Sequence, residues 1–163
     1  MGEALLQRWL DERGMAAEVT SAGFLPSGVP ATSPAVLTMA ARGLDIEGHR
    51  SREVSSQLLD QSDLVITMTR QHLIDLVLME PSSLSRTFQL TDLVRRAEKV
   101  GPRRPETAFA DWLELVGDGR TRQGILAASL SDDIADPIGQ SAAAYERTAV
   151  QLDDLLGRLA ALL

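Results

Sequence analysis

Asp63-Leu-Val-Ile-Thr-Met-Thr69 is the stretch of sequence that decides the fold. Its three residues after Asp63 are consecutively apolar, which is typical of a strand covered on both faces in a parallel sheet. A helical pattern follows over 71–79, and a second strand is predicted over 86–90. Strands that alternate with helices predict an α/β fold: a three-layer, doubly wound parallel sheet with helices on both faces.

Upstream of this strand, apolar residues at helical spacing predict a helix over 3–13. A short strand is expected over 17–23. The next helix is expected to open at Pro34, with Ser33 as its N-cap. A short helix over 55–61 then leads into the strand.

Downstream, Thr91 is expected to cap a helix, and another helix is predicted over 109–117. Ser141 opens a long terminal helix. Five leucines form the apolar stripe of that helix: Leu152, Leu155, Leu156, Leu159 and Leu163. The length predicts one domain over 1–163, with a helical insert at 95–130.

The composition limits the classes of function. Hydrophobic residues make up 44% of the 163 residues and charged residues 24%, which is too apolar for a disordered chain. The net charge of −7 argues against broad nucleic-acid binding. No apolar run approaches the roughly 20 residues of a membrane span, and no signal peptide is visible, so we expect a cytoplasmic protein that does not bind membranes. The sequence has no cysteine, which excludes disulfides, Cys-zinc sites and thiolate chemistry for these residues.

Three segments, taken in order, resemble one known family. They are Glu3-Ala-Leu-Leu-Gln-Arg-Trp-Leu with Val19-Thr-Ser-Ala-Gly23; Gly43-Leu-Asp-Ile-Glu-Gly-His-Arg-Ser-Arg52 leading to Asp63-Leu-Val-Ile-Thr-Met; and Asp133-Ile-Ala-Asp-Pro-Ile-Gly-Gln-Ser141 with Tyr145. Together they resemble the bacterial low-molecular-weight protein tyrosine phosphatases. The resemblance implies phosphomonoester hydrolysis with a cysteine nucleophile and an aspartate acid.

The family's defining motif is a Cys-x5-Arg phosphate loop between the first, central strand and the first helix. It typically runs into Ser-Pro-Met-Ala-Glu, and Met1-Gly2-Glu3 matches the last three of those residues. The resemblance therefore implies that the central strand, the nucleophile and the phosphate loop are missing from these residues. We expect a phosphatase-derived chain whose start was assigned at an internal methionine and which is inactive as given.

A second hypothesis is a phosphatase-like binding or regulatory module without catalysis. Losing a central strand would leave buried N–H and C=O groups unpaired, at about 1–3 kcal/mol for each group. Domain swapping in a homodimer would supply the strand from another copy. Arsenate reduction also needs cysteines, and an unrelated small-molecule binder would need a glycine-rich phosphate loop that the sequence lacks.

The resemblance assigns roles to five residues. Asp136 takes the position of the general acid, and Pro137 would fix its carboxylate. Ile138 stands where the family commonly has an aromatic residue that stacks on the substrate ring, and tight phosphotyrosine binding is correspondingly disfavoured. Ser21 and His49 would support the phosphate loop. Each has an ordinary alternative, because such residues also occur as solvated or locally hydrogen-bonded groups of turns and strand ends.

The remaining charged clusters predict little chemistry. Asp132, Asp133 and Asp136 lack regular metal-ligand spacing and are typical of a solvated acidic loop, so no metal and no cofactor are expected. The basic stretch over 95–104 is typical of a solvated helix face. The expected partner, if the intact protein is longer, is a phosphotyrosine protein or a small phosphomonoester.

Overall fold

The computed structural model describes residues 1–121, 125 and 132–163. Part of the predicted insert at 95–130 lies outside these described residues. Ser131, at the start of the predicted acidic loop, also lies outside them. Among the described residues, no helix has the length and apolarity needed to cross a membrane.

The chain divides into two compact units. The first, called here the terminal unit, consists of Met1–Val54 and Asp136–Ala160. The second, called the sheet unit, consists of Ser55–Ala135 and Ala161–Leu163. The single domain over 1–163 stays a prediction.

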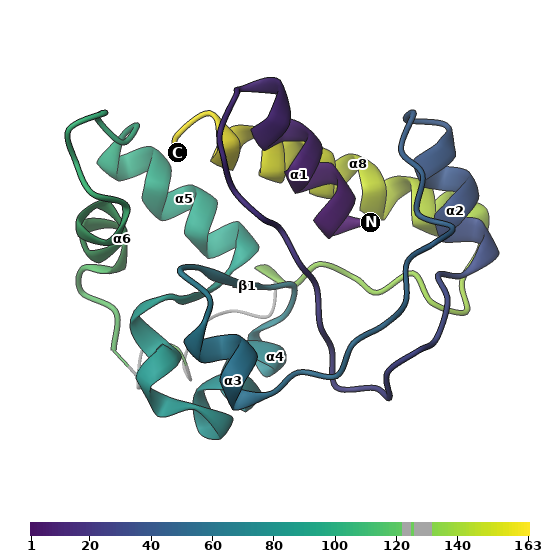
Figure 1. Cartoon of the computed structure of the whole chain (residues 1–163), viewed down its shortest axis with the longest axis horizontal. Coiled ribbons are helices and arrows are strands. Elements are labelled where there is room, and N and C mark those ends of the chain that lie inside the picture. Colours follow the sequence, from purple (N-terminus) through teal and green to yellow (C-terminus); the bar gives the residue numbers. More distant parts are fainter. Residues whose placement is uncertain (122–124, 126–131) are drawn as a thin grey trace. The chain divides into compact units, whose positions relative to one another are not determined.

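The sheet unit contains the strand predicted after Asp63. β1 (Val65–Thr67) pairs in parallel with β2 (Thr87–Gln89), with Val65 opposite Thr87. α4 (Arg70–Met79) and the 3₁₀ helix η1 (Pro81–Ser85) connect the two strands (Figure 1). Parallel strands require such a crossover, and the α/β prediction is confirmed. The sheet of the described residues has these two strands.

Three further helices complete the sheet unit. They are α3 (Ser56–Asp60), α5 (Leu90–Val100) and α6 (Phe109–Gly117). The expectation that Thr91 caps α5 was wrong, because β2 runs directly into the helix and Gln89 occupies the N-cap position. The indole of Trp112 is buried and donates from Nε1 to the carbonyl of Gly101 at 3.0 Å, which ties α6 to the end of α5.

The outer side of β2 is closed by an arginine side chain. The Arg120 guanidinium donates to the carbonyls of Leu84 and Thr87 and lies 3.8 Å from the centre of the Phe88 ring. Burial lowers the pKa of Arg120 to about 10, so the group keeps its charge at neutral pH. The side chain thus covers a strand edge that would otherwise expose unpaired backbone.

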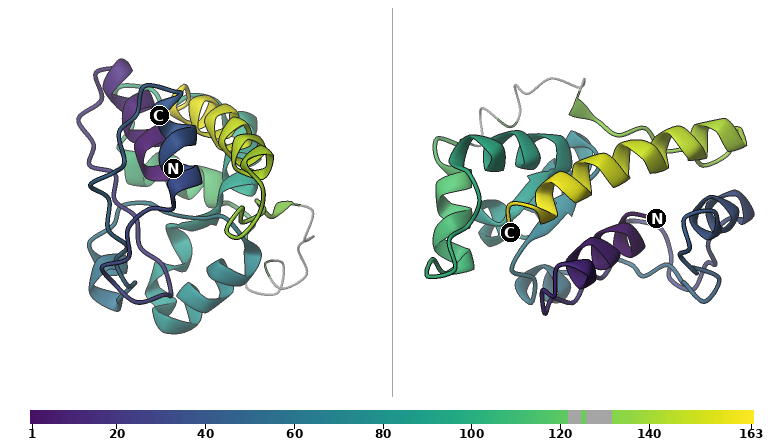
Figure 2. Two further views of the ribbon diagram at one scale, coloured as in Figure 1. Left: turned by 90° about the vertical axis from the view of Figure 1, so that its right-hand side faces the viewer. Right: turned by 90° about the horizontal axis from the view of Figure 1, so that it is seen from above.

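The terminal unit is built on its last helix. α8 (Ala142–Ala160) packs against both α1 (Gly2–Glu12) and α2 (Ser33–Ala40), and the top view in Figure 2 shows α1 running beside it. Four leucines of its predicted apolar stripe are buried: Leu152, Leu155, Leu156 and Leu159. The N-cap of α2 is Thr32 rather than the predicted Ser33, since the Thr32 hydroxyl accepts from the Ala35 amide.

Polar contacts fix the two helices on α8. The Asp153 carboxylate accepts from Arg8 Nη2 at 2.5 Å and from Trp9 Nε1 at 2.8 Å, which joins α1 to α8. The Arg42 guanidinium binds both carboxylate oxygens of Glu146, which joins the end of α2 to α8. This hydrogen bonding lowers the pKa of the Glu146 carboxyl, so the contact is lost as the pH falls.

The strand predicted over 17–23 is wrong. The segment is extended, but its backbone hydrogen-bonds to the side chain of Gln7 instead of to a neighbouring strand. Gln7 Nε2 donates to the Ala17 carbonyl, and Gln7 Oε1 accepts from the Val19 amide. Gly23 alone pairs with a neighbour, in a parallel bridge to Glu53. A glutamine amide presents the same donor and acceptor as a peptide group, which explains how an extended segment persists here without a ladder.

Gly157 on α8 makes room for the indole of Trp9. A Cβ added there would lie 2.9 Å from Trp9 Cε2. A mid-helix Gly→Ala change ordinarily gains roughly 0.5–1 kcal/mol, but overpacking costs about 1–3 kcal/mol. We expect Gly157→Ala to lower the free energy of unfolding in a urea titration. The matched control is Gly117→Ala, whose Cβ would meet Phe88 at an ordinary 3.6 Å; an equal gain in both variants would contradict the proposed crowding.

Candidate active site

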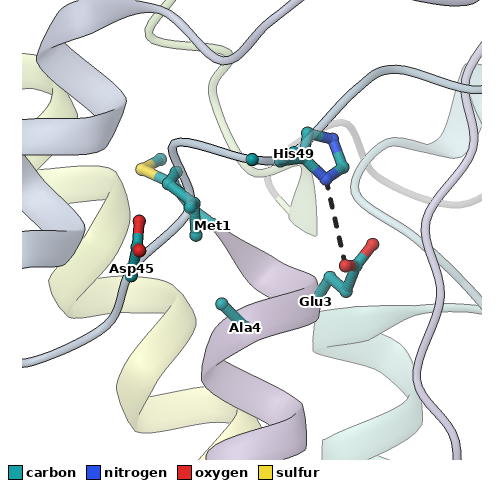
Figure 3. Close-up of a pocket in the computed structure, with 7 residues that line it drawn as sticks. Met1, Glu3, Ala4, Asp45 and His49 are labelled. Carbon is teal, nitrogen blue, oxygen red and sulfur yellow. Dashed lines mark ion pairs between the residues drawn. The ribbon is translucent and has the colours of Figure 1, made fainter.

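Glu3 is the centre of a polar cluster at the N-terminal end of α1. Its Oε2 accepts from the Ser21 hydroxyl at 2.5 Å, and its Oε1 lies 3.9 Å from His49 Nδ1. Figure 3 shows the Glu3 and His49 side chains pointing toward one another. The two residues predicted to support a phosphate loop therefore meet at a single carboxylate.

Local backbone structure brings these three side chains together. Glu3 lies in the first turn of α1, where a carboxylate is favoured by the helix dipole. Ser21 lies two residues before Gly23, and the bridge from Gly23 to Glu53 fixes the end of that extended segment. His49 follows a tight turn in which its amide donates to the Ile46 carbonyl at 3.1 Å.

A pocket of about 310 Å³ opens beside this cluster. It is lined by Met1, Glu3, Ala4, Asp45, Ile46, Gly48 and His49. Two of these side chains are carboxylates, and no arginine or lysine is among the described residues that line the pocket. Carboxylates repel a phosphate dianion, whereas the α1 N-terminus attracts one. The pocket therefore combines a helix end that attracts phosphate with two carboxylates that repel it.

Asp136 lies on a separate loop of the same unit, directly before α8. Its Oδ1 accepts from the Ile138 amide at 2.9 Å, and its carbonyl accepts from Gln140 Nε2 at 2.7 Å. Oδ1 thus closes an Asx turn at the start of the loop. Pro137 is buried under the turn, whereas Ile138 is 61% exposed.

The three aspartates of the acidic loop have different partners. Asp132 pairs with Arg95 at 3.2 Å, and Asp133 accepts from the Arg70 amide and the Gln89 side chain. The Asp136 carboxylate accepts within its own turn. No group of three metal-binding side chains is found within the described parts of the chain.

The predicted site residues thus fall into two groups. Ser21 and His49 come together, and Asp136, Pro137 and Ile138 share one turn. Throughout the described residues, no hydrogen bond or ion pair joins the two groups, and the assigned roles stay predictions. Sequence reasoning missed Glu3, although it lies in the Met1-Gly2-Glu3 match; its place in the first turn of a helix was the available signal.

The two contacts to Glu3 should differ in strength. Ser21→Ala removes a short hydrogen bond to a carboxylate, and we expect it to lower the free energy of unfolding by about 1–2 kcal/mol. His49→Ala should cost less than about 0.5 kcal/mol, because an ion pair at 3.9 Å between half-exposed groups contributes little. Urea titrations at pH 7 measure both. A larger loss for His49→Ala would show that His49, not Ser21, holds Glu3.

Comparison with known proteins relates this geometry to a family. Residues 1–103 match the family model for low molecular weight phosphotyrosine protein phosphatases. A probable low molecular weight protein-tyrosine-phosphatase, EpsP, from Ralstonia nicotianae is 30% identical over 120 residues, which cover 73% of this chain and 80% of that protein.

Solved structures agree in fold. The low molecular weight protein tyrosine phosphatase from T. tengcongensis superposes with a TM-score of 0.70 at 26% identity, covering 97% of this chain and 86% of that one. The YwlE arginine phosphatase from Geobacillus stearothermophilus gives a TM-score of 0.69 at 26% identity, covering 98% and 80%. With more than half its length matched by the family model and with a relative at 30% identity, this chain belongs to the low molecular weight phosphotyrosine protein phosphatase family.

Proposed function

We propose that these 163 residues hold the acid and the supporting side chains of a phosphomonoester hydrolase but not its nucleophile. In this assignment Asp136 is the general acid, and the buried Pro137 fixes the substrate-binding turn from which Ile138 contacts the substrate. Ser21 and His49 support a phosphate loop through Glu3. The 163-residue chain itself does not turn over phosphomonoesters, because none of its residues supplies a thiolate.

The convergence of Ser21 and His49 on Glu3 carries this proposal. Three polar side chains at a helix N-terminus, distant in sequence, are costly to bring together and serve to hold a neighbouring loop in one conformation. The pocket beside them has an attractive helix end, and no arginine or lysine is among its described lining residues. A Cys-x5-Arg loop joined at this point would supply both the thiolate and the arginine that binds phosphoryl oxygens.

In the extended protein the reaction has two steps. The thiolate attacks phosphorus and the ester oxygen leaves, taking the proton held on Asp136. Water then attacks the phosphocysteine and returns a proton to the Asp136 carboxylate, releasing phosphate and the free thiolate. Glu3, Ser21 and His49 touch neither reacting atom and act by positioning.

The test compares two proteins with p-nitrophenyl phosphate as substrate. The 163-residue chain should give no turnover above background. A version extended at Met1 by a strand, a Cys-x5-Arg loop and Ser-Pro should be active, and its Cys→Ser variant should not be. Turnover by the unextended chain would refute the assigned chemistry, whereas a folded but inactive extended protein that binds a phosphopeptide would favour the binding-module alternative.

The substrate class depends on Ile138. An exposed aliphatic side chain offers hydrophobic contact but no ring to stack on a phenyl group. We infer that phosphotyrosine is held less tightly here than by a site with an aromatic residue. In the extended protein, Ile138→Tyr should lower the KM for a phosphotyrosine peptide about 3–10-fold, since aromatic pairs add about 0.5–1.5 kcal/mol. A phosphoarginine peptide is the second substrate to measure, and preference for it in the Ile138 protein would reassign the class.

A further inference from the structure

The entry to the Asp136 loop is held by a carboxylate that the proposed chemistry does not use. Asp133 Oδ1 accepts from the Arg70 backbone amide at 2.8 Å and from Gln89 Nε2 at 2.7 Å. The next residue, Ile134, is buried, and its amide donates to the Met68 carbonyl at 2.9 Å. Three hydrogen bonds thus fix residues 133–134.

These partners lie at the end of strand β2 and at the start of helix α4. Gln89 is the last residue of β2 and is only 4% exposed, so its amide needs an internal partner. Arg70 is the first residue of α4, and a negative charge at this end of a ten-residue helix is favoured by the helix dipole. One oxygen atom therefore joins the chain before the loop to the ends of a strand and a helix.

The following residues are more exposed to solvent. Ala135 and Asp136 are exposed, and the bonds of the turn at 136–140 are made within the turn itself. Asp136 lies only three residues beyond Asp133, and at most about 3.5 Å per residue separates them along the chain. Fixing the position of Asp133 therefore limits the positions that the Asp136 carboxyl can reach.

We propose that Asp133 is the positioning residue of the acid loop: its carboxylate clamps the loop entry to β2 and α4. This inference rests on the proposed function for its consequence in catalysis, since it assumes that Asp136 is the acid. Its structural part concerns the 163-residue protein alone.

Hydrogen–deuterium exchange on the 163-residue protein tests the clamp. Asp133→Ala should speed amide exchange across 134–140 about tenfold, which is the loss of roughly 1.4 kcal/mol of local protection. Asp133→Asn should stay within about twofold of the native protein, because its Oδ1 still accepts both bonds. Asp132→Ala, which breaks the pair with Arg95, is the matched control and should leave 134–140 unchanged.

Two results would overturn the clamp. One is unchanged exchange over 134–140 in Asp133→Ala; the other is equal acceleration over β1 and β2, which would reveal general destabilisation instead. In the extended enzyme, Asp133→Ala should lower kcat with little change in KM, and Asp133→Asn should restore it. If the extended enzyme is inactive but Asp133→Ala still speeds exchange over 134–140, the proposed function is contradicted and the clamp is not. If the extended enzyme is active and its Asp133→Ala variant has a normal kcat, Asp133 has only a structural role.

Discussion

Phe88→Ala should lower the free energy of unfolding by about 3–5 kcal/mol, the usual cost of removing a fully buried aromatic side chain. Phe88 lies in the middle of β2 with no exposed surface. Its ring packs beneath the Arg120 guanidinium, and its Cζ lies 3.6 Å from the place of a Cβ on Gly117. Deleting the ring opens a cavity and removes the aromatic face on which a buried charge rests.

A urea titration at pH 7 measures the loss, and two variants calibrate it. Phe88→Leu keeps most of the buried hydrocarbon and should cost less than half as much. Phe109→Ala removes a half-buried ring that stacks on Trp112 at 6.1 Å between centroids, so it should also cost less. Since domains are stable by only 5–15 kcal/mol, Phe88→Ala should move the midpoint strongly; a loss below about 1 kcal/mol would contradict the packing described for Phe88.

The strands and helices of the sheet unit were predictable because local signals agreed there. The apolar run after Asp63 and the helical pattern over 71–79 became β1 and α4. The strand predicted over 17–23 was wrong because the extended backbone there pairs with the side chain of Gln7. Gln7 lies at least ten residues earlier in the chain, and no hydrophobic periodicity indicates such a contact. The contact of Arg120 with the edge of β2 was equally unpredictable, because residues more than 30 positions apart meet there only in the folded chain.

The candidate site was predictable residue by residue but not as an arrangement. Ser21 and His49 were found through the family resemblance, and the structure adds Glu3 as the carboxylate between them. Asp133 looked like one member of an acidic loop, because its sequence neighbours are also aspartates. Only the positions of Gln89 and the α4 N-terminus distinguish it from Asp132, and neither position can be read from spacing.

Asp136→Asn, made in the version extended with a Cys-x5-Arg loop, should lower kcat for phenyl phosphate by about 10²–10⁴-fold. Asparagine keeps the oxygen that accepts from the Ile138 amide but has no proton to give. The drop should be much smaller with p-nitrophenyl phosphate, because its leaving group is a weaker base and needs less protonation.

A matched control tests whether Asp136 is the acid. Asp132→Asn removes a neighbouring carboxylate whose partner is Arg95 and should leave both substrates unaffected. An equal drop with both substrates would assign Asp136 to loop structure instead, because only a proton donor distinguishes a good leaving group from a poor one.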